Sequence, residues 1–182
     1  MRQIWVFAAA AAMVSSAACA ADKFTVSSTS IPKDNKLTNT QVFNGFGCKG
    51  ENKSPALAWK GAPTGTKSFA VTVYDPDAPT GSGWWHWTVF NIPPGVTSLP
   101  EGAGAGAGLP AGAVQGRTEF GSAGFGGACP PAGDKPHRYD FTVYALKVEK
   151  LELPANATAS LTGFMVNGNT LAKATFTGTF GR

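Results

Sequence analysis

The chain is poor in charged residues, in histidine and in cysteine. Lys, Arg, Asp and Glu make up 14% of its 182 residues, against about 25% in an average soluble domain. The formal net charge is +4, and the basic residues are scattered along the chain rather than gathered into a stripe. Such a mild and scattered charge gives no electrostatic footprint for DNA or RNA. We therefore expect no nucleic-acid partner.

Long apolar runs are also absent, except at the N-terminus. Arg2 supplies a positive charge, residues 4–14 are apolar, and Ala18-Cys19-Ala20 matches a cleavage site with small residues. This order of features is typical of a secretory signal peptide. It predicts a signal peptide over residues 1–20 and one mature domain over residues 21–182, a usual length for a single domain.

The same apolar run is too short to cross a membrane, because a spanning helix needs about 20 apolar residues. We therefore expect no transmembrane anchor, and we expect the mature protein in the periplasm or outside the cell. A lipoprotein anchored through Cys19 is the alternative. Lipoprotein signals usually carry Leu or a similar residue three positions before that cysteine, where this chain has Ser16.

Signal cleavage would leave two of the three cysteines, Cys48 and Cys129. An even pair in an oxidising compartment favours a disulfide between them. The alternative is two free thiols, one of them reactive near His137.

Strand patterns dominate the rest of the sequence. The 23 Gly and 13 Pro residues favour a loop-rich β protein over a helical bundle. β-Branched and aromatic residues predict strands at residues 68–74, 87–92, 139–146 and 172–180. One helix is predicted over residues 157–166, with Asn156 as its N-cap and with Leu161, Phe164 and Met165 on one face.

Both histidines lie in segments rich in proline and aromatic residues. The strand that ends at Asp75 and the strand that begins near His86 are consecutive, and consecutive strands often lie side by side. His137 and Tyr139 begin another strand, so they can reach the same end of the sheet. The alternative is two unrelated histidines, each bonded to a backbone group.

A site at this sheet end would combine two imidazoles, a phenol hydroxyl and a carboxylate that fixes the tautomer of one imidazole. This combination suits a small anion, such as a phosphate or a carboxylate. Trp84, Trp85 and Trp87 would supply an apolar wall for the group that carries the anion.

Two other kinds of site remain open from the residues alone. A hydrolase could use His86 or His137 as a general base oriented by Asp75. Cys129 would then be the only strong nucleophile, and a disulfide would silence it. The two histidines and Asp75 could instead bind a metal ion as a facial triad.

Longer motifs occur in order along the chain. They are Asn52-Lys53-Ser54-Pro55-Ala56-Leu57-Ala58-Trp59, Asp75-Pro76-Asp77-Ala78-Pro79, Trp85-His86-Trp87, Gly112-Ala113-Val114-Gln115-Gly116-Arg117, and Pro130-Pro131 followed by His137-Arg138-Tyr139. In this order they resemble the signature segments of the phosphatidylethanolamine-binding protein family, in particular its exported bacterial Raf-kinase-inhibitor-like members. The resemblance covers almost all of the mature chain.

The resemblance implies a mainly β, single-domain fold, in which a large antiparallel sheet packs on a smaller sheet, with short helices. It also implies a small anion-binding pocket at one end of the sheet. Matched residue by residue, the ligand-binding residues would be Asp75, Ala78, Pro79, Trp84, His86, Pro131, His137 and Tyr139. The family often has a cis peptide in the first of these turns, which would lie between Ala78 and Pro79.

For function, the resemblance implies a binding protein and not an enzyme, with no catalytic residue, no cofactor and no metal. Its partner would be a small phosphate- or carboxylate-bearing ligand or a target protein, and inhibition of a kinase or protease is one such role. The sequence leaves open whether the chain forms a homodimer.

The remaining residues of the motifs are expected to be structural. Arg138 should pair with Asp77, because an arginine in such a motif needs a carboxylate partner when it is buried. Trp59 and Trp87 should lie in the core. The segment Phe125-Gly126-Gly127-Ala128 departs from the Tyr-Gly-Gly-Pro of many relatives, so a hydroxyl and a proline are missing there.

Overall fold

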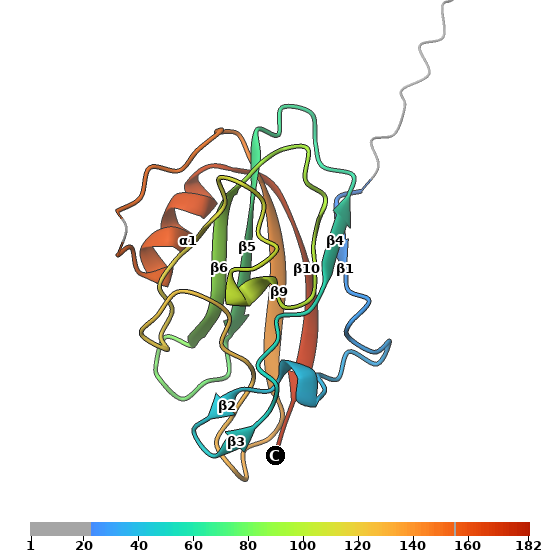
Figure 1. Ribbon diagram of the computed structural model, residues 1–182, viewed down its shortest axis with the longest axis vertical. Helices are drawn as coiled ribbons and strands as arrows, with labels where there is room; N and C mark the ends of the chain where they lie inside the picture. Colours follow the sequence, from blue (N-terminus) through green and yellow to red (C-terminus); the bar gives the residue numbers. More distant parts are fainter. Residues whose placement is uncertain (1–22, 155) are drawn as a thin grey trace, which may run out of the picture.

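The computed structural model describes residues 23–154 and 156–182, so the predicted signal peptide lies outside the described residues. A five-stranded antiparallel sheet in the order β10–β9–β5–β6–β8 forms the centre of the fold (Figure 1). Its strands are β5 (Ser68–Asp75), β6 (Trp84–Ile92), β8 (Val114–Gln115), β9 (His137–Leu146) and β10 (Thr170–Phe180). The four strands predicted from the sequence are all present, and three of them begin two or three residues earlier than predicted.

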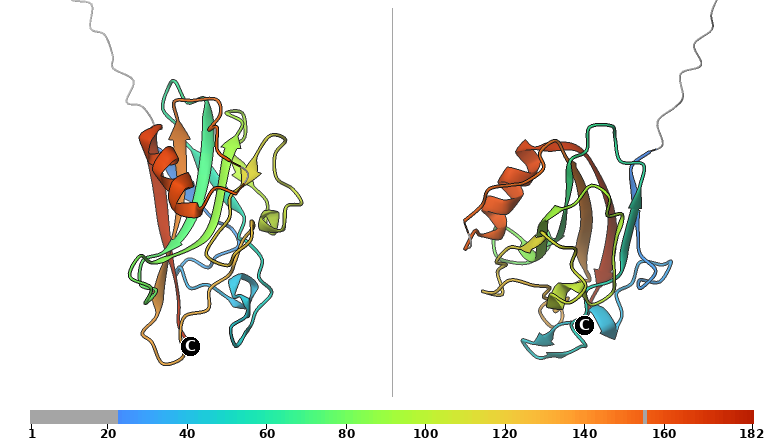
Figure 2. Two further views of the ribbon diagram at one scale, coloured as in Figure 1. Left: turned by 90° about the vertical axis from the view of Figure 1, so that its left-hand side faces the viewer. Right: turned by 45° about the horizontal axis from the view of Figure 1, so that its top comes forward.

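A smaller three-stranded sheet, in the order β1–β4–β7, packs on one face of the large sheet (Figure 2). The short elements are β1 (Thr25–Ser27), η1 (Asn39–Gln41), β2 (Asn44–Gly45), β3 (Cys48–Lys49), β4 (Leu57–Lys60), β7 (Ser98–Leu99) and η2 (Ala103–Ala105). The fold is therefore mainly β, with a large antiparallel sheet packed on a smaller one, as the sequence predicts.

The core has two parts because successive side chains of a strand point to opposite faces of the sheet. On one face, Phe141 of β9 lies in the same buried cluster as Trp59 and Trp87, which confirms that both tryptophans are core residues. On the other face, Tyr144 lies in a second cluster with Val166 of the helix α1 (Ala159–Gly168). The large sheet is thus covered on both faces.

The helix begins later than the sequence predicts. Thr158 is its N-cap, and the Thr158 hydroxyl accepts a hydrogen bond from the Leu161 backbone N–H at 3.2 Å. The predicted cap, Asn156, was wrong because Thr158 makes this bond two residues further on. Among the residues that the structure describes, no helix is long and apolar enough to cross a membrane.

The buried face of the helix also differs from the prediction. Phe164 is 74% exposed, and the buried positions are small or β-branched, including Gly163 and Val166. A Cβ at Gly163 would lie 3.0 Å from the ring of Trp85 in β6. The close approach of α1 to the sheet therefore selects the glycine face, and Leu161 and Phe164 are exposed, while Met165 is partly buried against the second cluster.

The sheet register brings the chemically interesting residues to one end of the molecule. Asp75 is paired with Trp84 between β5 and β6, and Tyr74 is paired with Asp140 between β5 and β9. The end of β5 and the beginnings of β6 and β9 therefore share one sheet end. This arrangement confirms the convergence predicted for the two histidine segments.

A disulfide between Cys48 and Cys129 joins the β2–β3 hairpin to the loop before β9. The predicted bridge is confirmed, and the alternative of two free thiols is wrong. The backbones also pair beside the bridge, because the Phe43 N–H donates to the Ala128 carbonyl at 3.0 Å. The hairpin is consequently fixed against the same sheet end.

Candidate functional site

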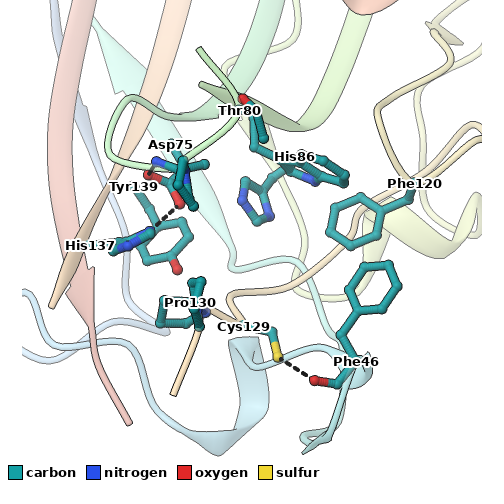
Figure 3. Close-up of a pocket in the computed structure, with 13 residues that line it drawn as sticks. Phe46, Asp75, Thr80, His86, Phe120, Cys129, Pro130, His137 and Tyr139 are labelled. Atoms are coloured by element: carbon teal, nitrogen blue, oxygen red, sulfur yellow. Dashed lines mark hydrogen bonds and ion pairs between the residues drawn. The ribbon is translucent and has the colours of Figure 1, made fainter. Parts of the chain in front are cut away.

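One cavity of about 170 Å³ opens at this sheet end (Figure 3). It is lined by all eight residues predicted to bind a ligand: Asp75, Ala78, Pro79, Trp84, His86, Pro131, His137 and Tyr139. Five further lining residues were not predicted, namely Phe46, Thr80, Phe120, Cys129 and Pro130. The structure therefore brings the eight residues together, and the ligand they would bind stays a prediction.

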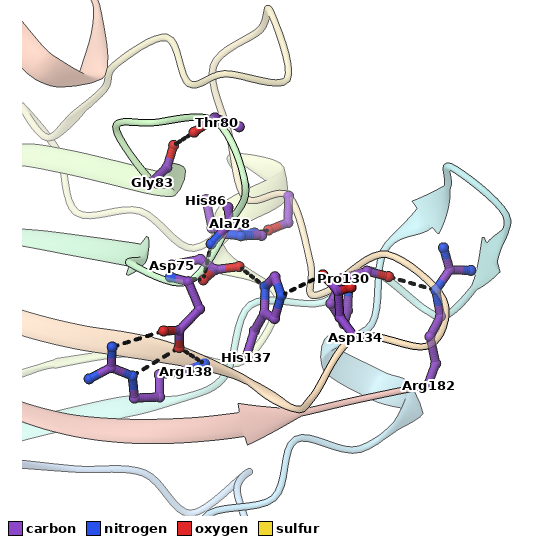
Figure 4. Close-up of polar contacts among 12 residues, drawn as sticks. Asp75, Ala78, Thr80, Gly83, His86, Pro130, Asp134, His137, Arg138 and Arg182 are labelled. Atoms are coloured by element: carbon purple, nitrogen blue, oxygen red, sulfur yellow. Dashed lines mark hydrogen bonds and ion pairs between the residues drawn. The ribbon is translucent and has the colours of Figure 1, made fainter.

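Asp75 is a buried carboxylate with three hydrogen-bond contacts and only 3% of its surface exposed. Its Oδ1 accepts hydrogen bonds from the backbone N–H groups of Asp77 at 2.8 Å and Ala78 at 3.1 Å. Its Oδ2 lies 2.8 Å from Nδ1 of His137 (Figure 4). Asp75 thus holds both the turn after β5 and the orientation of one imidazole, in agreement with the orienting role predicted for it.

His137 lies between two carboxylates. Its Nδ1 contacts Asp75, and its Nε2 lies 3.3 Å from Oδ2 of Asp134. An imidazole can donate from both nitrogens only when it is protonated, so this geometry suits an imidazolium ion. Neither nitrogen of His137 is free to bond a ligand while both contacts are in place.

His86 is bonded to the backbone rather than to a carboxylate. Its Nδ1 lies 2.7 Å from the Gly126 carbonyl, and the Gly126 N–H donates to the His86 carbonyl at 2.9 Å. Because a carbonyl can only accept, Nδ1 must carry the proton. Burial lowers the pKa of His86 to about 4, since the apolar surroundings disfavour the imidazolium form. His86 is therefore neutral at physiological pH, and its Nε2 is a hydrogen-bond acceptor.

Two polar atoms of the cavity have no hydrogen-bond partner among the described residues: Nε2 of His86 and the hydroxyl of Tyr139. Both side chains are buried, with 4% and 1% of their surface exposed. Burial, followed by the charges of Asp75 and Asp77, raises the pKa of Tyr139 above its usual range, so the phenol keeps its proton. Buried polar atoms are seldom left unpaired, which makes this pair the natural place for a ligand to bond.

Aromatic side chains form the mouth of the cavity. Phe120 lies 4.6 Å from Phe43 and 6.0 Å from Phe46, measured between ring centroids, and Trp84 meets Phe120 edge to face at 5.5 Å. Phe46, at the tip of the β2–β3 hairpin, is 68% exposed. We refer to Phe46, Trp84 and Phe120, which line the cavity, as the aromatic mouth. It would accept an apolar group attached to whatever bonds His86 and Tyr139.

The predicted wall of three tryptophans was wrong in two of its members. Only Trp84 lines the cavity. Trp85 points to the opposite face and packs beneath α1 against Gly163, and Trp87 is fully buried in the core. Trp85 lies on the face opposite to those of Trp84 and His86, as strand alternation requires. A register irregularity between Trp85 and Trp87 explains why these two residues do not share a face.

Two further expectations concern the turn after β5. Arg138 forms the predicted pair with Asp77, with Nε to Oδ2 and a terminal nitrogen to Oδ1 both at 2.9 Å. This hydrogen-bonded pairing lowers the pKa of Asp77 to about 2. The Arg138 side chain is 58% exposed, so the pair lies at the surface and not in the interior as we expected. The Ala78–Pro79 bond is trans, and the expected cis peptide was wrong.

The loop that holds His86 is itself held by Asn52. The Asn52 amide donates to the Phe125 carbonyl at 3.2 Å and accepts from the Gly127 N–H at 2.7 Å. These two bonds flank Gly126, whose carbonyl fixes His86. The motif that begins at Asn52 signalled this residue, but its role requires contacts 73 and 75 residues away in the chain, which the sequence does not reveal.

Gly126 offers a direct test of this arrangement. A Cβ there would overlap the ring of Phe120, which cannot move without disturbing the aromatic mouth. We expect Gly126→Ala to lower the free energy of unfolding by about 1–3 kcal/mol, as overpacking does. Chemical denaturation measures this loss. The control is Gly95→Ala, where a Cβ meets nothing within 4 Å, and a loss of equal size in both variants would contradict the packing argument.

No group of three or more His, Cys, Asp or Glu side chains placed to hold a metal ion occurs in the described ranges 23–154 and 156–182. Asp75 and His137 bond to each other, and His86 is bonded to Gly126. The predicted alternative of a facial triad therefore finds no support in the geometry. The cavity at this sheet end is lined by buried polar groups and bordered by aromatic rings.

Comparison with known proteins identifies the family. The model of the phosphatidylethanolamine-binding protein family matches residues 27–181. The chain is 62% identical to YbcL of Escherichia coli over 156 residues, which are 85% of each chain. It is also 51% identical to YbhB of the same organism over 146 residues, which are 80% of this chain and 92% of YbhB. The chain belongs to the phosphatidylethanolamine-binding protein family, and the predicted resemblance is confirmed.

Solved structures support the same assignment. The crystal structure of Escherichia coli YbcL, described as a member of the mammalian family of these proteins, has a TM-score of 0.86 at 59% identity and covers 88% of this chain and 99% of that chain. A homologue from Chlamydia trachomatis, CT736, has a TM-score of 0.72 at 31% identity and covers 87% of this chain and 97% of that chain. The predicted fold class is thereby confirmed as well.

Proposed function

We propose that this protein is an exported binding protein whose pocket takes the phosphate or carboxylate group of a small molecule or of a target protein. If the pocket or its mouth binds the surface of a target protein, the bound complex can inhibit that target. The proposal includes no catalytic step. The observation that carries it is the buried and unpartnered pair of Nε2 of His86 and the Tyr139 hydroxyl at the floor of an aromatic-lined cavity.

The hydrolase alternative is less well supported by the positions of the imidazoles. A general base needs one nitrogen held by an orienting group and the other aimed at the reacting group. His137 has the orienting carboxylate, but its other nitrogen faces Asp134. His86 has a free nitrogen, but its orienting partner is a backbone carbonyl.

The bonding of the potential nucleophiles in the cavity also favours a binding protein over an enzyme. Cys129 lines the cavity, but its sulfur is part of the disulfide. Thr80 is the hydroxyl residue of the turn after β5, and its Oγ1 donates to the Gly83 carbonyl at 2.5 Å. Neither side chain is paired with an imidazole, as an activated nucleophile would be.

Export is proposed from the N-terminal pattern and from the disulfide. Disulfides persist in oxidising compartments such as the periplasm and are rare in the cytosol. The Cys48–Cys129 bridge therefore agrees with the signal peptide predicted over residues 1–20. Together they support a periplasmic or secreted protein.

Thermal denaturation with inorganic phosphate at pH 6 tests the binding function. A ligand present at 100 times its Kd stabilises by about 2.7 kcal/mol, which raises the Tm by about 5–10 °C for a domain of this size. Tyr139→Phe removes one hydroxyl and keeps the ring, so it should abolish most of the rise. Tyr74→Phe is the matched control, because the Tyr74 hydroxyl bonds the Ser82 carbonyl outside the cavity. An equal rise in both variants would place the phosphate elsewhere.

A further inference from the structure

The hydrogen-bonding groups left free in the cavity determine which protonation state of an oxyanion fits. Asp75 already accepts three hydrogen bonds, and His137 has both nitrogens against carboxylates. Among the described residues that line the cavity, the buried side-chain atoms without a hydrogen-bond partner are Nε2 of His86 and the hydroxyl of Tyr139. A ligand that bonds both atoms must therefore donate a hydrogen bond to Nε2 of His86 and also bond the hydroxyl of Tyr139.

The tautomer of His86 is fixed by the backbone and not by the ligand. Its Nδ1 proton is directed at the Gly126 carbonyl at 2.7 Å, and Asn52 holds that carbonyl from both sides through Phe125 and Gly127. Nε2 therefore presents a lone pair to the cavity. A fully deprotonated anion would place an oxygen lone pair against this nitrogen, and the two would repel each other.

The charges around His86 do not compensate for that repulsion. From β5 it faces the carboxylate of Asp75, and from β9 it faces His137, which itself contacts Asp75 and Asp134. Tyr139 is a neutral phenol, and Phe120 on the remaining side carries no charge. A cation lies at the rim, where Arg182 donates to the Pro130 carbonyl at 2.7 Å. It attracts monoanions of equal charge alike, whether or not they carry an acidic proton.

We propose that the pocket selects an oxyacid monoanion that retains one acidic proton, such as a monoprotonated phosphomonoester, and rejects oxyanions of the same shape that carry no proton. The P–OH group donates to Nε2 of His86, and an oxygen of the same phosphoryl group accepts from the Tyr139 hydroxyl. The aromatic mouth takes the organic substituent. This inference rests on the proposed function and adds the protonation state to it.

The ligand keeps its proton in this scheme, so no covalent bond forms or breaks. At a pH above the second pKa of the phosphomonoester, about 6, most of the free ligand is the dianion. Binding then takes up one proton from solution for each ligand bound. A buried neutral imidazole supports this direction, because the low pKa of His86 opposes protonation of the protein instead.

Phenyl phosphate and phenyl sulfate form a matched pair of probes. At pH 5 both are monoanions with the same ring and the same tetrahedral head, and only the phosphate carries an O–H group. We expect phenyl phosphate to bind at least about tenfold more tightly, because the sulfate leaves Nε2 of His86 unpaired. Between pH 6 and 8 its affinity should fall about tenfold per pH unit, while that of phenyl sulfate stays flat.

Isothermal titration calorimetry at pH 7.5, in two buffers of different ionisation enthalpy, measures the proton uptake directly. We expect about one proton per phenyl phosphate bound. His86→Gln provides an N–H donor at the same place, so this variant should bind both probes alike. If the variant unfolds, the comparison of the two probes on the unmodified protein is sufficient.

The outcomes separate this inference from the proposed function. If neither probe binds, the proposed anion pocket is wrong. If both probes bind with equal affinity and the same pH dependence, the pocket binds anions but does not distinguish a ligand with an acidic proton from one without. That result overturns this inference alone. Parallel tightening of both probes as the pH falls would show that His86 itself takes up the proton, which also overturns it.

Discussion

Loss of the Cys48–Cys129 disulfide is expected to lower the free energy of unfolding by about 4–5 kcal/mol. The bridge spans 81 residues of sequence, and a crosslink over a loop of this length removes a large part of the conformational entropy of the unfolded chain. Native domains are stable by only about 5–15 kcal/mol, so the loss is a large share of the total. Urea denaturation of the oxidised protein and of the Cys48→Ser, Cys129→Ser double variant measures it.

Two controls distinguish the crosslink from local packing. The unmodified protein in a thiol reductant should match the double variant, since both lack the bridge. Cys48 is 8% exposed, so a serine there buries a hydroxyl, and any additional loss in the double variant relative to the reduced protein measures this local cost. Thiol titration of the denatured protein without reductant should find no free thiol in the chain that lacks residues 1–20. Equal stability with and without reductant would contradict the expected effect.

The disulfide should also influence the pocket, because it anchors the hairpin that carries Phe46. Phe46 lies in the aromatic mouth, and Cys129 lines the cavity next to Pro130. Without the bridge, the hairpin is held by backbone pairing such as the bond from Phe43 to Ala128. We therefore expect weaker ligand binding in the double variant even at temperatures where it is fully folded.

The sequence predicted the strands and their shared end because both depend on local patterns. Runs of β-branched and aromatic residues mark β5, β6 and β9, and Pro76 and Pro93 mark where the first two of them end. Adjacency of consecutive strands then places Asp75 beside the beginning of β6. No contact distant in sequence was needed for these inferences.

The predictions that were wrong or incomplete, for the buried face of α1 and for the lining of the cavity, depend on packing between distant segments. The orientation of α1 is set by the fit of Gly163 against Trp85, and a helical pattern that contains Leu161 and Phe164 gives no sign of it. Phe46 and Phe120 were not predicted for the site because they come from a hairpin tip and a loop without any strand pattern. They reach the cavity through aromatic contacts with each other and with His86.

The hydrogen-bond partners of the two histidines could not be predicted either, because they too come from segments distant in the sequence. The sequence suggested that one carboxylate would orient one imidazole, and the structure assigns Asp75 to His137. It could not indicate that a glycine carbonyl 40 residues away holds His86 as a neutral acceptor. That assignment leaves the pocket with one imidazole acceptor beside one hydroxyl, in place of two equivalent imidazoles.

Removal of the Asp75 carboxylate is also expected to lower the free energy of unfolding strongly. Asp75→Ala leaves the N–H groups of Asp77 and Ala78 and the ring of His137 without their acceptor. Breaking a buried pair in this way costs about 3–5 kcal/mol. Denaturation with urea measures the loss, and the affinity for phenyl phosphate should fall with it, because the turn and the imidazole shape the cavity.

Asp75→Asn separates the contribution of the hydrogen bonds to the turn from that of the contact with His137. The amide oxygen can still accept from the turn, but the amide N–H now faces Nδ1 of His137, so Nδ1 must give up its proton and become an acceptor. Loss of the charge-assisted bond alone costs about 1.5–3 kcal/mol, so this variant should lie between the unmodified protein and Asp75→Ala. Asp77→Asn is the control two residues along the chain, where loss of the pair with exposed Arg138 should cost much less stability than either change at Asp75.

The same variants distinguish a binding protein from a hydrolase. In a hydrolase the wrong tautomer disables the general base, so Asp75→Asn would keep most of the binding while turnover collapses. In a binding protein stability and affinity change together, and no turnover exists to be lost. A screen of ester, phosphoester and peptide substrates, with Asp75→Asn and His137→Ala beside the unmodified protein, makes the comparison. Turnover above background that disappears in both variants would overturn the binding function, and we expect none because neither Cys129 nor Thr80 is paired with an imidazole.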